Sequence, residues 1–160
     1  MPYATQNSNP TMMAFSLQPV NGAGIDRQSL FALYKSELYA HIDHAFGWNE
    51  AFQQTRFEAS YPDAEISLIK AADATAGFVA LKDTNESLHV SLLLVHAAFQ
   101  NRGIGEAVMR SLMSRAGESH RPLTLSCFSR NTGAMRFYES LGFRIVSTDE
   151  HFVSYQLNTR

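Results

Sequence analysis

The residues most suggestive of chemistry are those of Gln100–Gly105, which could bind an anion. Gly103 and Gly105 leave the backbone bare where a helical pattern begins, so successive N–H groups can converge on one point. The start of a helix carries partial positive charge, and Arg102 adds a full charge. The segment therefore predicts a phosphate or pyrophosphate site. Taken alone, the two glycines could equally serve only to turn the chain.

Neighbouring residues exclude two common phosphate-binding motifs. A P-loop requires Gly-Lys-Ser or Gly-Lys-Thr, whereas Gly105 is followed by Glu106 and Ala107. A dinucleotide fingerprint requires a third glycine where this chain has Val108, and it lies on an early strand. The ligand therefore has to be identified from the elements around the loop.

Hydrophobic periodicity predicts the elements that precede the loop. Met12–Gln18 alternates weakly and predicts a strand, after which Asp26 has the character of a helix N-cap. A second helix is predicted at Asn49–Glu58, with Phe52 facing inward. Three strands joined by short turns follow as an antiparallel meander, and the last, Ser87–Val95, is rich enough in leucine and valine to be buried on both faces.

After the loop, helical spacing returns at Ile104–Ala116 and is followed by a strand at Pro122–Phe128. A strand, a helix and a strand in this order predict a parallel pair with a right-handed crossover. Asn131 then caps another short helix, and two strands complete the chain at Phe143–Val146 and Phe152–Leu157.

In this setting the chain resembles the GNAT superfamily of acyl-CoA N-acyltransferases. The resemblance covers about residues 12–157 and is specific between Leu93 and Arg144, in Leu-Leu-Val-His before Gln-Asn-Arg-Gly-Ile-Gly and in Asn131–Arg144. It implies a mixed, mostly antiparallel sheet of six to seven strands with a splayed parallel pair and about four helices. The expected organisation is a flexible tail at residues 1–11 and one acyltransferase domain at residues 12–160.

The resemblance also implies the cosubstrate and its contacts. Acetyl-CoA, or another short acyl-CoA, would lie in the splayed opening, with Asn131, Ala134 and Tyr138 at its thioester end. Offsets of three and seven residues independently place these three on one helical face. The pantetheine arm would follow one strand, and the pyrophosphate would meet the loop; the residues implied are Leu93, Leu94, Val95, Gln100, Asn101, Arg102, Gly103, Ile104, Gly105 and Glu106.

The reaction implied is direct transfer of the acetyl group to a primary amine of a small molecule, a peptide N-terminus or a lysine. Tyr138 is the predicted general acid for the leaving thiol, as is a tyrosine at this place in the family. A backbone amide near Leu94 is predicted to polarise the oxyanion. Many relatives carry a glutamate before the Leu-Leu-Val run, and this chain has none there. His89 as a base and Ser91 as a group that orders water remain alternatives.

The acceptor side is predicted from the first two helices. His44, Trp48 and Phe52 are candidate substrate contacts, although aromatic residues at such spacings more often form core. Arg56 is open to two interpretations, contact with a carboxylate or exposure to solvent. The segment Asp43–Glu50 resembles a branch of the superfamily whose acceptors are poorly defined.

Composition narrows the remaining classes. A net charge of −2 over 160 residues favours neither nucleic acid nor a membrane surface as a partner, and no apolar run is long enough to span a bilayer. The single cysteine, Cys127, excludes an internal disulfide, predicts a buried structural thiol and suits the cytoplasm. No metal-spaced cluster is found, so no metal is expected. A monomer or homodimer is expected.

Two other functions compete with catalysis. One is a non-catalytic acyl-CoA-binding or sensing module, which keeps the loop but needs neither Tyr138 nor a base. The other is a structural interaction domain, which predicts no coenzyme A binding at all.

Overall fold

The computed structural model describes residues 14–20 and 26–158, and these form one seven-stranded sheet with four α-helices. The predicted tail, and the start of the strand predicted at Met12, lie outside the described residues. The elements are β1 (Ser16–Pro19), α2 (Arg27–Phe46), α3 (Glu50–Ser60), η1 (Asp63–Glu65), β2 (Ile66–Ala71), β3 (Ala74–Asp83), β4 (Leu88–Val95), η2 (Ala97–Phe99), α4 (Ile104–Glu118), β5 (Leu123–Phe128), α5 (Thr132–Ser140), β6 (Arg144–Thr148) and β7 (Phe152–Leu157).

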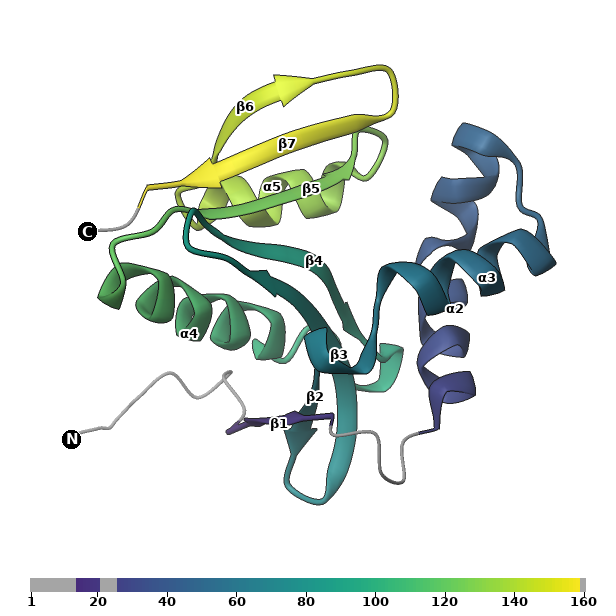
Figure 1. The fold of residues 1–160 in the computed structure, drawn as a ribbon, viewed down its shortest axis with the longest axis horizontal. Helices are drawn as coiled ribbons and strands as arrows, with labels where there is room; N and C mark the ends of the chain where they lie inside the picture. Colours follow the sequence, from purple (N-terminus) through teal and green to yellow (C-terminus); the bar gives the residue numbers. More distant parts are fainter. Residues whose placement is uncertain (1–13, 21–25, 159–160) are drawn as a thin grey trace.

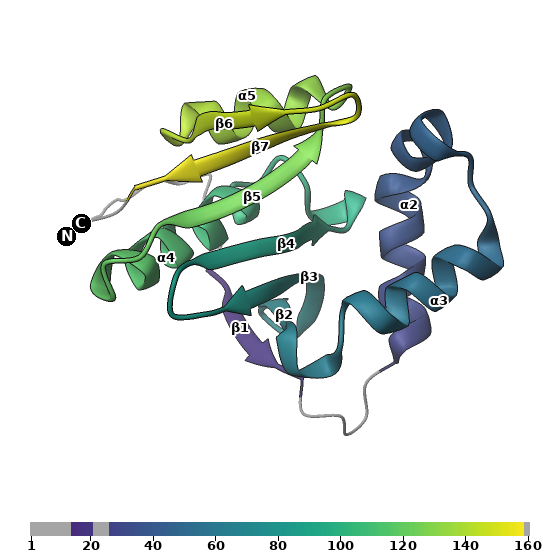
Figure 2. The same ribbon diagram turned by 45° about the horizontal axis from the view of Figure 1, so that its top comes forward.

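The sheet combines an antiparallel half with a parallel pair, as predicted. Its order is β1-β2-β3-β4-β5-β7-β6, and all neighbours are antiparallel except β4 and β5. The parallel pairing runs only from Leu88 opposite Leu123 to Val90 opposite Leu125. Beyond that point the two strands separate, which Figure 2 shows as a widening gap toward their C-terminal ends. The predicted fold class is confirmed.

Helices cover both faces of the sheet and create two separate cores (Figure 1). On one face, α4 contributes residues such as Val108 and Leu112, and side chains of α5 pack beside them. On the other face, α2 and α3 contribute Leu33 and Phe57, among others. The strands of the sheet therefore separate two hydrophobic cores.

A β-bulge divides β4 at Ser91. Ala80 pairs with Leu92 and Leu81 pairs with Val90, so Ser91 is an extra residue on this strand. The extra residue reverses the alternation of side chains: Val90 belongs to the α4 core, whereas Leu92 belongs to the α2–α3 core. The prediction that this strand is buried on both faces is therefore wrong. Buried and half-buried residues alternate along it, and the buried side changes at the bulge.

The predicted helix starts are correct. Side-chain oxygens of Asp26, Asn49 and Asn131 accept backbone N–H groups at the first turns of α2, α3 and α5. The inward orientation predicted for Phe52 is wrong, because 59% of this residue is exposed. Phe52 lies on the exposed side of α3, and Phe57 is the aromatic residue of this helix that enters the core.

Candidate active site

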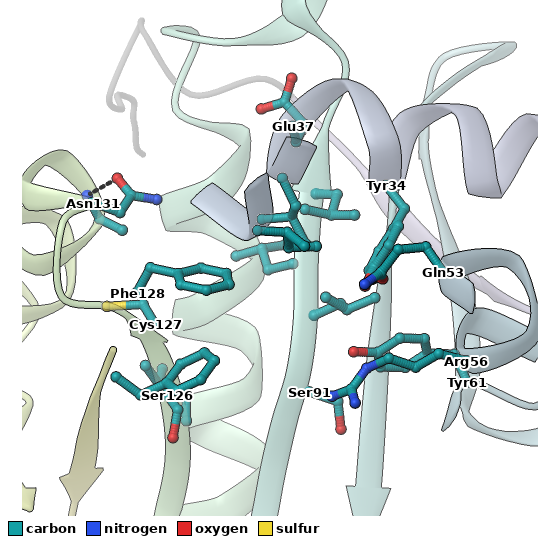
Figure 3. A pocket seen from close by; sticks show the side chains of 18 of the residues that line it. Tyr34, Glu37, Gln53, Arg56, Tyr61, Ser91, Ser126, Cys127, Phe128 and Asn131 are labelled. Atoms are coloured by element: carbon teal, nitrogen blue, oxygen red, sulfur yellow. Dashed lines mark hydrogen bonds between the residues drawn. The ribbon is translucent and has the colours of Figure 1, made fainter. Parts of the chain in front are cut away.

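A cavity of about 900 Å³ begins where β4 and β5 separate, and it is the feature around which the candidate site is built. Figure 3 shows it between the β5 wall and the α2–α3 wall, with β4 as its floor. Its lining combines apolar side chains with hydroxyl, amide and thiol groups and two charged side chains; the residues include Tyr34, Glu37, Leu38, Phe52, Gln53, Arg56, Tyr61, Ser91, Leu92, Leu93, Leu94, Ser126, Cys127, Phe128, Asn131, Ala134, Tyr138 and Phe152.

The backbone N–H and C=O groups of successive β4 residues point alternately toward β3 and toward this gap. A Cβ built on Gly77 of β3 would lie 2.0 Å from the Leu94 carbonyl oxygen, so that carbonyl faces β3. The Val95 carbonyl instead accepts from the Gln100 side chain at 2.8 Å. Because N–H and C=O of one strand residue point to the same side, the Leu94 amide also faces β3. The amide facing the gap is that of Leu93, next to Leu94, near which the oxyanion donor was predicted.

The β5 wall presents Asn131 and Tyr138 together. The Asn131 Oδ1 accepts from the Ala134 N–H at 3.1 Å, which leaves its amide nitrogen directed toward the cavity (Figure 3). The Tyr138 ring packs against Phe143, with centroids 5.8 Å apart, and burial raises the pKa of its hydroxyl. A raised pKa keeps the phenol protonated, as a proton donor requires. The structure thus brings Tyr138, Asn131 and Ala134 to one wall.

Cys127 lies on this wall beside Tyr138 and behaves as an apolar group. It packs against the α4 core on the face that it shares with Leu123 and Leu125. Burial raises the pKa of its thiol to about 11, so the nucleophilic thiolate is suppressed at neutral pH. Cys127 is half-buried and lines the cavity, so the prediction of a fully buried thiol is not met, although its packing is that of a structural residue.

The α2–α3 wall holds polar residues that sequence reasoning mostly missed. The Tyr34 hydroxyl donates to Gln53 Oε1 at 2.9 Å, and Gln53 is only 5% exposed. Tyr61 and Arg56 lie beside them (Figure 3). Burial raises the pKa of Tyr34 to about 12. The three-residue offset between Gln53 and Arg56, which places both on one helical face, was the available signal.

The two walls are joined by side chains at the ends of the cavity. Arg130, which follows β5, donates to the Ala40 carbonyl of α2 at 2.7 Å. Gln100, at the start of the glycine loop, donates to Glu37 of α2 at 2.9 Å. The glycine loop is therefore hydrogen-bonded to a residue that lines the cavity, although no residue of the loop lines the cavity itself.

The glycine loop has the geometry expected of an anion site. Asn101 and Gly103 adopt left-handed conformations, with φ of 63° and 80°. The first helical bond of α4 joins the Ala107 N–H to the Gly103 carbonyl, and no side chain caps this helix. The N–H groups that precede Ala107 thus have no partner within the helix. Of the four described α-helices, α4 alone begins without a side-chain cap.

Three loop residues contribute differently from one another. Ile104 is 1% exposed and its side chain belongs to the α4 core, so it can offer only its backbone N–H to a ligand. Glu106 pairs with Arg110 at 2.8 Å. The Arg102 guanidinium lies 5.8 Å from the centre of the Phe99 ring and provides positive charge beside the bare N–H groups.

Three of the residues predicted as catalytic or acceptor contacts lie apart from the cavity. His89 is on the paired part of β4, where its Nδ1 is 2.8 Å from Thr124 Oγ1 and burial lowers its pKa. Trp48 donates from Nε1 to Glu50 at 2.9 Å and stacks in the aromatic cluster of α2. His44 is exposed at the end of α2. None of the three lines the cavity, so the structure does not support them as base or substrate contacts.

The described residues lack two features. They contain no group of three or more histidine, cysteine, aspartate or glutamate side chains able to hold a metal ion. Within the same ranges, no helix combines the length and the apolar character required to cross a bilayer.

Solved structures of acetyltransferases share this fold. An N-acetyltransferase from Staphylococcus aureus Mu50 has a TM-score of 0.67 and 14% identity, over 89% of this chain and 100% of that one. A GNAT family acetyltransferase from Elizabethkingia anophelis with acetyl-CoA bound has a TM-score of 0.63 and 17% identity, over 90% and 97%. The PaiA N-acetyltransferase from Thermoplasma acidophilum in complex with coenzyme A has 0.67 and 13%, over 91% and 99%.

At these identities the structural likeness concerns the fold alone. The family assignment comes from the sequence: the family model described as an acetyltransferase (GNAT) domain matches residues 34–155. The match spans both cavity walls, the glycine loop and α5. Because it covers well over half of the chain, this protein belongs to the GNAT family of acetyltransferases.

Proposed function

We propose that this protein transfers an acetyl group from acetyl-CoA directly to a primary amine, with Tyr138 as the general acid. One observation carries the proposal: the opening between β4 and β5 has Tyr138 on its wall and is linked through Glu37 and Gln100 to the uncapped start of α4. Coenzyme A has a pyrophosphate at one end of a polar arm and a reactive sulfur at the other. The pyrophosphate would meet the start of α4, and the sulfur would meet Tyr138. Two structures of this fold hold acetyl-CoA or coenzyme A.

The chain offers a different group to each part of the cosubstrate. The N–H groups at the start of α4 and the Arg102 guanidinium suit the pyrophosphate. The Leu93 and Val95 backbone groups that do not pair with β3 suit the amides of the pantetheine arm. The cavity then receives the acetyl group and the acceptor.

Acetyl transfer breaks the C–S bond and forms a C–N bond. The amine nitrogen attacks the thioester carbonyl carbon, and the Leu93 N–H stabilises the oxyanion that forms. As the tetrahedral intermediate collapses, the sulfur leaves and takes a proton from the Tyr138 hydroxyl. The nitrogen loses its proton to water, and water returns a proton to the Tyr138 phenolate, so that the phenol is regenerated.

The cavity lining offers no strong base close to Tyr138. Among lining residues of the described chain the only carboxylate is Glu37, which is held by Gln100. We therefore propose that the amine binds as its free base, with water as the proton acceptor. Rates should then follow the fraction of neutral amine.

Two measurements test the proposal in sequence. Calorimetry with acetyl-CoA measures binding, and absence of binding at millimolar ligand would exclude the whole assignment. A thiol-release assay over a panel of primary amines then measures transfer. Binding without thiol release for any amine would favour the non-catalytic acyl-CoA-binding module instead.

A further inference from the structure

We propose that the acceptor amine carries a carboxylate, which the Arg56 guanidinium binds on the α3 wall of the cavity. This inference rests on the proposed function, because it concerns the second substrate of that reaction. It specifies the substrate as a small amino acid-like molecule rather than a simple amine.

The charges on the cavity wall are the first argument. Among the lining residues that the structure describes, Glu37 is the only carboxylate and Arg56 is the only cationic side chain. Glu37 is held by Gln100 near the glycine loop. None of the ion pairs among the described residues includes Arg56, whereas Arg27, Arg110, Arg115 and Arg121 each have a carboxylate partner. The Arg56 guanidinium interacts with the Tyr34 hydroxyl, so the cavity presents one cation whose positive charge is not balanced by a carboxylate.

The groups beside Arg56 are the second argument. Arg56 lies beside Tyr61 on the cavity wall (Figure 3), and its guanidinium hydrogen-bonds to Tyr34. Its charge lowers the pKa values of both tyrosines against the larger effect of burial. The Tyr34 hydroxyl donates to Gln53, but the Tyr61 hydroxyl makes no hydrogen bond with the described part of the chain. A planar guanidinium beside a free phenol matches the two oxygens of a carboxylate.

The position of Arg56 separates it from the coenzyme phosphates. Arg56 is on α3, which covers one face of the sheet, whereas the uncapped start of α4 belongs to the other face (Figures 1 and 2). Figure 3 shows the Arg56 side chain extending from α3 toward Ser91, where β4 and β5 begin to separate. The guanidinium thus faces the space that remains for the acceptor.

The experiment compares each L-amino acid with its own amide in the thiol-release assay. The two members differ by one negative charge and hardly in size. We expect the wild-type protein to have a kcat/KM roughly ten- to a hundredfold higher for the preferred acid than for its amide, the usual range for a charge-assisted hydrogen bond. Arg56→Met should abolish this preference mainly through KM, while Arg56→Lys should retain part of it.

Two controls separate the substrate claim from loss of fold or of cofactor. Arg144→Met removes an exposed arginine on β6, outside the cavity, and should keep the preference. Calorimetry should give the same acetyl-CoA affinity for wild type and Arg56→Met. An Arg56→Met variant that no longer binds acetyl-CoA would show that Arg56 is structural and would overturn the inference.

Failure of the inference can be distinguished from failure of the proposed function. Transfer to amides as fast as to acids in every pair would overturn the inference and leave N-acetyl transfer standing. If no amine is acetylated, the inference is tested by calorimetry of the N-acetylated L-amino acids and their amides with the coenzyme A-bound protein. Tighter binding of an acid that disappears in Arg56→Met would support the carboxylate site, and equal binding throughout would reject it.

Discussion

The two halves of β4 carry similar sequences but perform different tasks. From Leu88 to Val90 the strand pairs on both sides, and its backbone groups are used within the sheet. From Leu92 to Val95 it pairs only with β3, and its other edge faces the cavity. Ser91, the extra residue between them, is the point where the parallel pairing ends and the core-facing side changes.

This difference shows how a sheet can acquire a binding site without losing its core. A strand edge released from its neighbour exposes N–H and C=O groups that must find another partner. In this acetyltransferase the released edge lies between two covered faces, so an extended polar chain such as pantetheine can act as the missing strand. The bulge lets the same run of leucines fill both cores on either side of that opening.

Deletion of Ser91 is expected to have the largest effect on this arrangement. Without the extra residue, Leu92 and Leu94 would move to the α4 face or Leu88 and Val90 would leave it. Two misplaced aliphatic side chains cost about 3–6 kcal/mol, a large part of the stability of a domain. Chemical denaturation should show a much lower midpoint of unfolding, or no folded protein at all.

The matched control for the deletion is Ser91→Ala, which keeps the bulge. The Ser91 Oγ is buried without a hydrogen-bond partner in the described residues, so its removal should change the free energy of unfolding by less than about 1 kcal/mol. A deletion variant as stable as Ser91→Ala would contradict the role assigned to the bulge.

Tyr138→Phe tests the chemistry of the opened half. Turnover should fall by roughly ten- to a thousandfold while acetyl-CoA affinity is retained, because only the proton donor is removed. Tyr155→Phe is the control: Tyr155 is 1% exposed, lies outside the cavity and donates to Glu139 at 2.6 Å. That variant should lose stability rather than turnover. Unchanged turnover in Tyr138→Phe would remove Tyr138 from the mechanism.

Gly105→Ala and Gly117→Ala together compare the two ends of α4 for their effect on acetyl-CoA binding. A Cβ at Gly105 would meet Phe137 at 3.7 Å, an ordinary contact, so the fold accepts it. Alanine should stabilise the helix by about 0.5–1 kcal/mol and weaken acetyl-CoA binding by roughly tenfold, because the methyl group shields the backbone. Gly117→Ala, at the other end of α4, should leave affinity unchanged. Equal affinities in both variants would argue against the phosphate site.

The pH profile of the wild-type protein, which requires no substitution, tests the general acid most specifically. Burial raises the pKa of Tyr138 above its ordinary value of about 10, so the acid stays protonated through pH 7–10. The neutral fraction of an amine with a pKa near 10 rises about tenfold per pH unit below that value. The kcat/KM should therefore increase from pH 7 toward pH 10. A descending limb within that range would contradict a buried tyrosine as the acid.

The parts of the site that were predictable are contiguous in the sequence. The glycine turn before α4 and the Asn131 cap of α5 follow from local spacing, and the structure has both. Tyr138 was singled out by the resemblance to the family, and it lies in the cavity lining. The bulge at Ser91 could not be predicted from the Leu88–Val95 sequence, because leucine can be buried on either face of the sheet. Whether the Leu93 or the Leu94 amide faces the gap depends on that register.

The α2–α3 wall was the least predictable region. Tyr34, Gln53, Tyr61 and Arg56 come from two helices and the turn that follows them, and only tertiary packing brings them together. Trp48 and Phe52 were more conspicuous because they are large. Size does not determine orientation, however: Trp48 packs beside Tyr39 and does not line the cavity, whereas Phe52 lines the cavity and is mostly exposed.

Gly77 has a consequence for how tolerance to mutation should be read in this protein. Any side chain there would collide with the Leu94 carbonyl oxygen and push β4 away from β3. In a saturation-mutagenesis map scored by activity, Gly77 should be as intolerant as Tyr138, although it touches neither substrate. The two positions would separate only when abundance is scored as well, since intolerance at Gly77 reports spacing and intolerance at Tyr138 reports chemistry.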